Sequence, residues 1–323
     1  MKSSRATLLT STSQAALRKC PRLYWMRYEL GLTRVRKAQP LRFGAGYHKG
    51  LELWRGLFGQ HVAGILETVL AEYAVVPEWA DPVEWAVERE TLRALLTGYF
   101  WRYGNDNLTF ASVEQAFGFP LRNPSTGHAS RRFKLAGKWD GIVRLSDGRL
   151  LDMEYKTSGE DISPDADYWR RLRYDGQISL YVLAARAKGY DVAGVLYDVT
   201  RKPTIRLRQK ETPEQYGQRL LDDIGQRPDY YYQRREIPRL EDDLARFQAE
   251  TWQLSRHLLD LRKRANRLAD PSLAWFRNIS KLTCGQCEYA DVCLNGMPVD
   301  PACPPAGFQI LASVHPELEE EAR

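Results

Sequence analysis

The feature that most constrains the fold is a pair of predicted strands at residues 131–145 and 149–157. Ser146-Asp147-Gly148 joins them, and an Asp-Gly pair between two such segments is a strong hairpin signal. Asp140 lies on the first strand, whereas Glu154 and Lys156 lie two residues apart on the second, and therefore on one face. The hairpin can bring two carboxylates and an ammonium group together.

These side chains suit metal-assisted chemistry on a phosphate ester. Carboxylates hold Mg²⁺ or Mn²⁺ with positions open for water and phosphate. The ion promotes ionisation of the water, and a nearby ammonium stabilises developing negative charge. Asp152 shares this strand face but lies outside the Glu-x-Lys unit, so we expect it to be peripheral. Because a solvated strand face with cross-strand ion pairs gives the same pattern, the pattern needs support elsewhere in the chain.

The flanking segments predict a mixed sheet covered by helices. Ser11, Thr12 and Ser13 are placed to cap an N-terminal helix. Apolar residues recur at helical spacing in three segments, residues 44–73, 79–103 and 165–188. Three further strands are predicted, at residues 109–119, 193–200 and 204–208, and the chain from there to residue 267 is expected to be mostly helical. This order predicts an α/β core with an N-terminal helical insertion.

Two further helices carry polar residues at one-turn spacing. Gly44, His48 and Glu52 recur every four residues and therefore share a helix face. An imidazole added to a carboxylate site favours Mn²⁺ as well as Mg²⁺. Gln177 and Tyr181 also lie one turn apart. By itself either pair is compatible with an ordinary helix surface.

Composition and charge limit the kinds of partner that this protein is expected to bind. The 323 residues are 43% hydrophobic and 27% charged, as in ordinary globular proteins. They contain no apolar run of the roughly 18–20 residues that spans a bilayer and no evident secretory signal, so we expect a cytoplasmic protein without membrane contact. The net charge of +6 suits a polyanion such as nucleic acid.

Cations alternate with aromatic rings at Arg18–Arg27 and Tyr168–Tyr174. Such segments can hold phosphates and stack on unpaired bases, although amphipathic helices with core-facing rings look the same. The second segment gives four candidate DNA contacts, Arg170, Arg171, Arg173 and Tyr174.

The five cysteines indicate ligands rather than disulfides, since their number is odd and a cytoplasmic location is expected. Cys284, Cys287 and Cys293 form a C-x2-C-x5-C pattern that needs a fourth ligand. Cys303 would keep the site local, and Cys20 would close a loop of more than 260 residues. Spacing alone chooses neither between these two nor between zinc and an iron–sulfur cluster.

Together these motifs resemble the PD-(D/E)XK nuclease superfamily and, within it, the RecB-like branch. That branch has a G-x3-H-x3-E helix, a D…(D/E)-x-K hairpin and a Q-x3-Y helix in this order. The resemblance implies a restriction-endonuclease-like α/β fold with a mixed central sheet, an N-terminal helical insertion and a C-terminal Cys-rich segment. It implies a metal site formed by His48, Asp140, Glu154 and the backbone carbonyl of Tyr155.

The resemblance also implies roles for three more residues. Lys156 would act on the attacking water, and Gln177 and Tyr181 would contact DNA or steady the lysine. The segment LLDMEYKTSG departs from the usual strand, because Glu154 replaces the common Asp and Ser158 precedes the glycine. The exchange of Asp for Glu stays within the superfamily's pattern.

The cysteines are similar to those of AddB-type subunits and CRISPR-associated exonucleases, which carry one cysteine before the nuclease core and three after it. The resemblance implies a [4Fe–4S] cluster, with zinc as the alternative, and leaves Cys303 over. The cluster would fasten the N-terminal helix to the C-terminal tail. Its ligands would be Cys20, Cys284, Cys287 and Cys293.

The activity that the resemblance implies is that of a metal-dependent deoxyribonuclease, as an exonuclease or a single-strand-acting enzyme. It would serve recombination, repair, phage DNA processing or CRISPR adaptation. The sequence has no G-x4-G-K-[S/T] phosphate loop, so unwinding would need a helicase or recombination partner. One alternative is a DNA-binding or scaffolding subunit of a helicase–nuclease complex, and another is a zinc-stabilised nucleic-acid-binding protein without catalysis.

The expected organisation has four segments. The nuclease core is expected at residues 109–236, after a helical region with the His48 motif at residues 44–108. Residues 1–43 would carry the first cluster cysteine, and residues 237–323 would form the C-terminal helix and the cluster tail.

Overall fold

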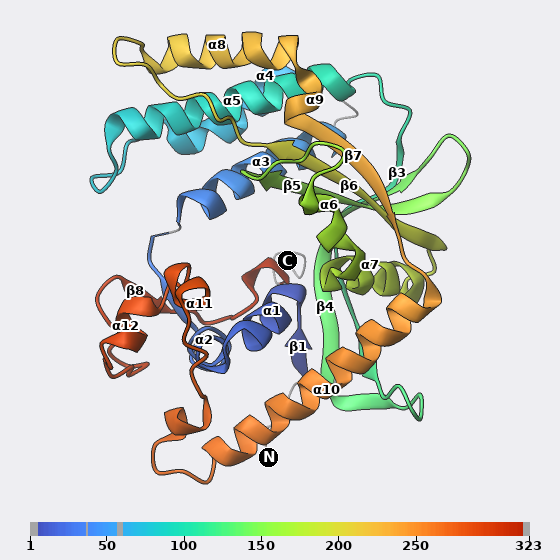
Figure 1. The fold of residues 1–323 in the computed structure, drawn as a ribbon, viewed down its shortest axis with the longest axis vertical. Coiled ribbons are helices and arrows are strands. Elements are labelled where there is room, and N and C mark those ends of the chain that lie inside the picture. Colours follow the sequence, from blue (N-terminus) through green and yellow to red (C-terminus); the bar gives the residue numbers. More distant parts are fainter. Residues whose placement is uncertain (1–5, 37, 57–60, 319–323) are drawn as a thin grey trace. The chain divides into compact units, whose positions relative to one another are not determined.

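The computed structural model describes residues 6–36, 38–56 and 61–318, which form two compact units (Figure 1). Unit 1 combines three stretches, Met1–Lys37, Ala116–Lys138 and Leu240–Arg323. Unit 2 combines Ala38–Gln115 and Trp139–Arg239. Two strands, β3 (Thr109–Arg122) and β4 (Ala129–Arg144), contribute residues to both units.

Unit 2 is built on a mixed sheet. The C-terminal part of β4 pairs antiparallel with β5 (Leu150–Ser158), with Gly141 opposite Met153. β5 pairs parallel with β6 (Val192–Arg201), and β6 pairs antiparallel with β7 (Tyr232–Pro238). Gly148 closes the β4–β5 turn with φ +88°, a conformation that glycine adopts without strain. The predicted mixed sheet flanked by helices is confirmed.

Helices cover both faces of this sheet. Met153 and Tyr155 of β5 pack into a core with Trp54, Leu96 and other side chains of the helices on one face. These helices are α3 (Gln39–Gly56), α4 (Val62–Leu70), α5 (Pro82–Tyr103), α8 (Pro213–Gln226) and α9 (Pro228–Tyr231). The other face carries α6 (Asp167–Arg171) and α7 (Gly176–Ala187), as Figure 1 shows. Alternation along β5 therefore directs Glu154 and Lys156 towards α7.

Three predictions for unit 2 are wrong. The single helix predicted at residues 165–188 divides into α6, the short 3₁₀ helix η3 (Leu172–Tyr174) and α7, because the Asp175 side chain caps α7 by accepting from the Gln177 amide at 2.7 Å. The strand predicted at residues 204–208 is irregular, although Ile205 and Leu207 pack on the core. The edge strand is β7, which we had predicted as part of a helical region.

Unit 1 joins the N-terminal segment to the C-terminal one. β1 (Thr7–Leu9) pairs parallel with the N-terminal part of β4, and β2 (Leu32–Arg34) pairs antiparallel with β8 (Phe308–Ile310). The long helix α10 (Glu241–Ala265) contacts α1 (Ser11–Lys19), where the Thr251 hydroxyl donates to Gln14 Oε1 at 3.0 Å. The N-cap of α1 is Thr10, whose side chain accepts from the Ser13 amide, and the predicted Ser13 completes the capping box by accepting from the Thr10 amide at 2.9 Å.

Short elements complete the described chain. α1 ends at Lys19, with Cys20 as its C-cap, because Pro21 has no N–H to continue the helix. α2 (Pro21–Tyr24) then leads into a π-helical turn, η1 (Trp25–Glu29). Towards the C-terminus, α11 (Lys281–Gly285) and α12 (Ala290–Leu294) follow α10. The remaining 3₁₀ turns are η2 (Ala71–Tyr73), η4 (Pro271–Ala274) and η5 (Pro316–Leu318). Among the described helices, none has the length and apolar character needed to cross a bilayer.

Candidate active site

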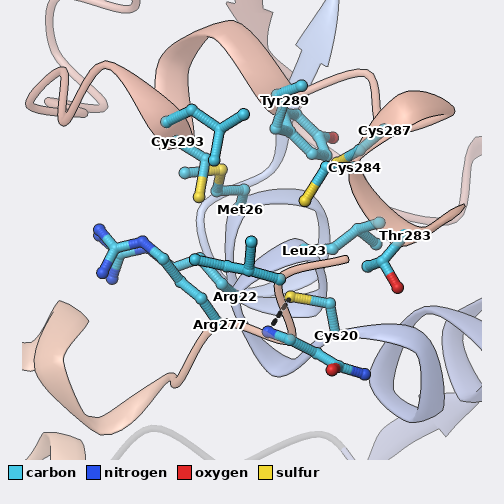
Figure 2. Close-up of a pocket in the computed structure, with 14 residues that line it drawn as sticks. Cys20, Arg22, Leu23, Met26, Arg277, Thr283, Cys284, Cys287, Tyr289 and Cys293 are labelled. Carbon is cyan, nitrogen blue, oxygen red and sulfur yellow. Dashed lines mark hydrogen bonds between the residues drawn. The ribbon is translucent and has the colours of Figure 1, made fainter. Parts of the chain in front are cut away.

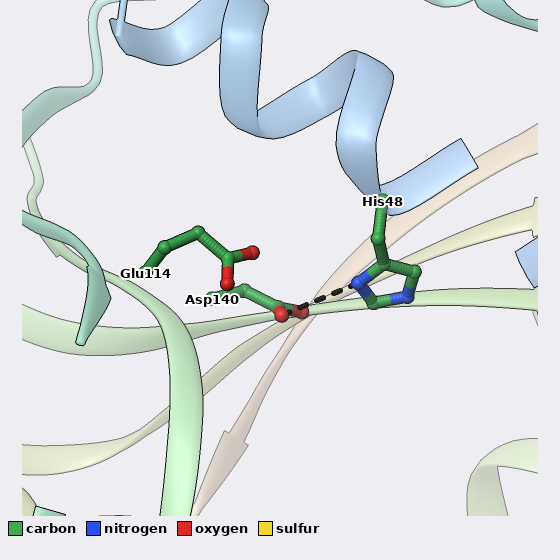
Figure 3. Close-up of side chains that lie close together, drawn as sticks. All are labelled: His48, Glu114 and Asp140. Carbon is green, nitrogen blue, oxygen red and sulfur yellow. Dashed lines mark hydrogen bonds and ion pairs between the residues drawn. The ribbon is translucent and has the colours of Figure 1, made fainter. Parts of the chain in front are cut away.

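Three possible metal ligands meet in unit 2 (Figure 3). His48 comes from α3, Glu114 from β3 and Asp140 from β4, and their ligand atoms lie within 4.8 Å of one another. His48 Nδ1 is 3.3 Å from Asp140 Oδ1. All three side chains are partly buried, which leaves the group accessible to an ion. An imidazole and two carboxylates form a donor set that suits Mn²⁺ or Mg²⁺.

Glu114 is the member of this group that we did not predict. Its φ is +42°, and a positive φ is uncommon for residues other than glycine. Strained backbone of this kind concentrates at functional sites. The sequence around Glu114 alternates like any half-buried strand, so only its position beside His48 and Asp140 marks it as a candidate ligand.

Asp140 connects the His48 helix to the second strand of the hairpin. Its Oδ1 faces His48, and its Oδ2 accepts a hydrogen bond of 2.7 Å from the backbone N–H of Tyr155. The backbone of Tyr155 is therefore fixed beside Asp140. Glu52, which shares the predicted helix face, instead pairs with Lys49 at 3.0 Å.

Four predicted residues form a second network on β5 and α7. Lys156 Nζ donates to Glu154 Oε1 and, at 3.3 Å, to Gln177 Oε1. The amide nitrogen of Gln177 donates to the same Glu154 oxygen at 2.7 Å and contacts the Tyr181 hydroxyl at 2.9 Å. Because Gln177 contacts the carboxylate, the ammonium and the phenol, α7 sets the position of the Glu-x-Lys pair.

The charged groups shift one another's protonation equilibria. Burial raises the pKa of Glu154 to about 7. The charge of Lys156 lowers this pKa, but the negative charge of Asp140 opposes that effect. Burial works against the charged form of Asp140, but His48 and the Tyr155 amide bring the pKa of Asp140 below its usual value. Burial disfavours the charged form of Lys156, yet Glu154 and Asp140 raise the pKa of that ammonium. Lys156 is therefore a cation at neutral pH.

Asp152, which we expect to be peripheral to the site, lies on the same strand and is buried. Its side chain is fully buried, and neither carboxyl oxygen has a hydrogen-bond partner in the described part of the chain. Burial and the nearby charges of Glu154 and Asp140 raise the pKa of Asp152 well above its usual range. Burial therefore favours the protonated form of this carboxyl group.

The predicted DNA contacts lie on α6 and η3, which lead directly into α7. Arg170 pairs with Asp167 at 3.1 Å, and Arg171 pairs with Glu160, both at exposed positions. The guanidinium of Arg173 lies over the Tyr174 ring, which is 66% exposed. These four side chains are therefore on the surface of unit 2, at the N-terminal end of the helix that carries Gln177 and Tyr181.

Four cysteines line one cavity in unit 1 (Figure 2). Cys20 lies between α1 and α2, where its sulfur accepts a hydrogen bond from the backbone N–H of Asn278 at 3.4 Å. The other three come from the segment containing α11 and α12, and they are Cys284, Cys287 and Cys293. Cys303 is exposed and does not line the cavity.

Four cysteines around one cavity match the number of ligands that a tetrahedral zinc ion or an iron–sulfur cluster takes. Arg22 and Arg277 also line the cavity and complement the charge of thiolates.

One of three comparisons with known proteins identifies a family for this chain. The family model described as the PD-(D/E)XK nuclease superfamily matches residues 9–294, a range that contains every predicted site residue. No curated protein gives a significant match. Among solved structures, a chain described as "Crystal structure of SSO0001" is 12% identical, with 91% of this chain and 89% of that chain covered and a TM-score of 0.35. A similarity this distant indicates nothing about activity.

Proposed function

The chain belongs to the PD-(D/E)XK nuclease superfamily, and on that premise we propose that it hydrolyses phosphodiester bonds in DNA with Mg²⁺ or Mn²⁺. The observation that carries the proposal is the pairing of Glu154 with Lys156 on the strand beside Asp140. A purely structural descendant of a nuclease would have no need of two carboxylates and an ammonium group held together in a buried network.

His48, Asp140, Glu154 and the Tyr155 carbonyl would hold the ion, and Glu114 is placed to assist them. When bound, the ion polarises the scissile phosphate and promotes ionisation of a water molecule.

The chain's own groups prepare the site for the reaction. The Tyr155 amide orients Asp140, and Gln177 holds both partners of the Glu154–Lys156 pair. The Lys156 ammonium orients the attacking water and stabilises the negative charge that develops on the phosphate. Tyr181 contacts the Gln177 amide and so limits its rotation.

The substrate we propose is single-stranded DNA or DNA with free ends. Arg170, Arg171, Arg173 and Tyr174 are exposed at the start of α7 and can contact phosphates and an unpaired base. The activity would suit recombination, repair, phage DNA processing or CRISPR adaptation, with a separate helicase where strands must be unwound.

We also propose a [4Fe–4S] cluster on Cys20, Cys284, Cys287 and Cys293. The shared cavity supports it, and zinc is the alternative. Metal analysis of anaerobically purified protein tests the assignment. We expect iron in the wild-type protein and in Cys303→Ser, and loss of iron in Cys284→Ser. Stoichiometric zinc in the wild type would contradict the cluster.

The nuclease proposal is tested with end-labelled linear DNA and circular DNA in the presence of Mg²⁺, Mn²⁺ or EDTA. Lys156→Ala should slow metal-dependent cleavage by roughly 100-fold or more, because one group that stabilises transition-state charge is lost. Lys210→Ala, at an exposed position of the same unit, is the matched control. Cleavage of linear DNA alone would identify an exonuclease. Folded protein that binds DNA but cleaves neither form would identify a scaffolding subunit and overturn the proposal.

A further inference from the structure

We propose that unit 1 carries a second nucleic-acid site, a groove that binds the backbone of a single strand. The groove has a volume of about 470 Å³ and lies between the start of β4 and the helix α10. It contains none of the candidate active-site residues or cluster cysteines. Its volume is within the range of known ligand sites. The residues that define it are Arg131, Arg132, Trp252, Arg256 and Lys263.

The charge of this basic groove is the first argument. Four of its lining residues are cations and none is a carboxylate. In the part of the chain that the structure describes, the side chains of Arg131, Arg132 and Arg256 make no ion pair or hydrogen bond. Lys263 contacts Asp260 at 3.4 Å, but both are 56% exposed, and such a pair is weak. Unpaired cations in a concave surface attract polyanions.

The second argument is the order of the side chains along α10. Trp252, Arg256 and Lys263 are separated by four and seven residues, so they share one face of the helix. At 1.5 Å per residue this face is about 16 Å long, which is the axial length of several nucleotides. A chain of phosphates can therefore contact both cations while it follows the groove.

Trp252 gives the groove its preference for a single strand. It is half-buried, and its ring makes no contact with another aromatic ring or cation among the described residues. A tryptophan beside cations is the arrangement on which unpaired bases stack, with little dependence on sequence. A duplex keeps its bases stacked on one another and cannot use the ring in this way.

This inference rests on the proposed function only in taking nucleic acid as the polyanion. An acidic protein segment is the competing occupant. The two differ in one respect, because a polyglutamate chain has charge but no bases to stack on Trp252.

The test is the binding of a fluorescein-labelled oligothymidylate to the full chain, measured by anisotropy in EDTA so that no cleavage occurs. Arg256→Ala/Lys263→Ala should weaken binding about tenfold. It should also make the slope of log K against log salt less negative by about 1.4, since two contacts to single-strand phosphates are lost at about 0.7 each. Trp252→Leu should weaken binding at least fivefold through lost stacking.

The matched control is Arg246→Ala/Arg264→Ala. Both residues are exposed on α10 and do not line the groove, so the same charge is removed from the same helix. Equal losses of affinity in the two double variants would overturn the proposal. So would unlabelled polyglutamate that displaces the oligonucleotide as well as unlabelled oligothymidylate does, because that result would assign the groove to an acidic protein.

The groove proposal and the nuclease proposal can each be contradicted without contradicting the other. Wild-type protein that binds the oligonucleotide through the groove but cleaves no DNA with metal would leave the groove standing without the nuclease. Protein that cleaves DNA while the groove variants bind with wild-type affinity would leave the nuclease standing without the groove.

Discussion

Glu114 combines two properties at the scale of a single residue, a positive φ and a position beside His48 and Asp140. Replacing it with glycine removes the strain, whereas alanine keeps it, and both remove the carboxylate. We therefore expect Glu114→Gly to be more stable than Glu114→Ala by about 1 kcal/mol. Urea unfolding in EDTA measures this difference.

The control is the same pair of substitutions at Val113, which has an ordinary negative φ. There alanine should be the more stable variant, because glycine loses more conformational freedom on folding. Calorimetric titration with Mn²⁺ should show weaker binding for both Glu114 variants. Unchanged Mn²⁺ affinity would remove Glu114 from the metal site even if the stability difference is found.

Gln177 is expected to act by positioning Lys156 and Glu154. Gln177→Ala removes both contacts and should lower kcat about tenfold or more with a smaller change in KM, since small misplacements of catalytic groups strongly reduce rates. Tyr181→Phe removes one hydroxyl contact to Gln177 and should have a smaller effect. Steady-state kinetics on a labelled oligonucleotide distinguishes the two. A larger loss in Tyr181→Phe would show that Gln177 is not the positioning residue.

Sequence reasoning placed Asp140, Glu154 and Lys156 near one another because a hairpin and a two-residue period leave little freedom. In the structure His48 contacts Asp140, Asp140 contacts the Tyr155 backbone, and Glu154 pairs with Lys156. Glu114 was not predicted as a ligand, because it is marked only by its backbone angle and its neighbours in space. Neither can be recognised from an isolated acidic residue in a strand sequence. The burial of Asp152 was likewise not predicted, since fully buried carboxyl groups are rare among acidic residues.

At the scale of elements, α5 packs closely where Gly98 lies. A Cβ there would lie 2.6 Å from Ile224 Cγ2 and would also meet the Tyr232 hydroxyl, which donates to the Leu95 carbonyl at 2.8 Å. Gly98→Ala should therefore destabilise the protein by about 1–3 kcal/mol, in spite of the better helix propensity of alanine. Gly44 in α3 has nothing within 4 Å of such a Cβ. Gly44→Ala should be neutral or stabilising in the same urea titration, and equal losses would contradict the packing argument.

A buried ion network connects α3, the segment after α5 and β7. Asp106 accepts from Arg55 at 2.8 Å and from Arg234 at 3.0 Å, and all three side chains are at most 15% exposed. Burial works to raise the pKa of Asp106, but the Arg55 hydrogen bond and charge, with those of Arg234, hold that pKa below its usual value. The network therefore stabilises the fold above the unfolded-state pKa of about 4, and this stabilisation is lost as pH falls through the lower folded value.

We expect Asp106→Asn to lower the free energy of unfolding by about 3 kcal/mol at pH 7, because the buried Arg55 loses its carboxylate partner and Arg234 keeps only Asp198. The difference from wild type should narrow below about pH 4, where the carboxylate of the unfolded wild-type chain becomes protonated. Urea titrations at several pH values measure it. Asp222→Asn, at an exposed position on α8, is the control and should show little change. A difference that stays constant down to pH 3 would contradict the role of this carboxylate.

The elements that the sequence predicted are those whose pattern is local. β3, β4 and β5 show alternation and a turn signal, and α3 and α5 show helical spacing, so all five were expected. The break before α7 depends on one hydrogen bond from the Asp175 side chain, which a spacing argument overlooks. β7 contains charged residues and forms because β6 offers a free edge and Asp198 pairs with Arg234 at 2.8 Å. Both contacts join residues that are far apart in sequence, so a local sequence pattern does not predict them.

For the whole molecule, the predicted segments and the compact units divide the chain differently. The prediction used four contiguous ranges, whereas unit 1 assembles three separated ones. Contact between distant ranges cannot be read from local pattern, and the cysteines were the one sequence feature that indicated it. Cys20 and Cys293 line the same cavity although more than 260 residues separate them.

If the cluster stabilises unit 1, its loss should increase local unfolding in unit 1 before it affects unit 2. In Cys20→Ser we expect faster amide hydrogen exchange in α1, α2, α11 and α12, while β5, β6 and α5 of unit 2 keep their protection. Hydrogen-exchange mass spectrometry compares this variant with Cys303→Ser, whose cysteine lies outside the cavity. Equal loss of protection in both units would show instead that the whole chain unfolds as one cooperative body.

Because the two units are interleaved along the chain, they can be completed only in a certain order during synthesis. Unit 2 is complete once the ribosome has passed Arg239, whereas α1 waits for its contact with α10, and Cys20 waits for the last cavity cysteine, Cys293. Until then the Cys20 thiol lacks the cysteines that share its cavity, although β1 can already pair with β4. Completion of unit 1 is therefore a late event in the synthesis of the chain, and a chain released early would contain a finished unit 2 and an incomplete unit 1.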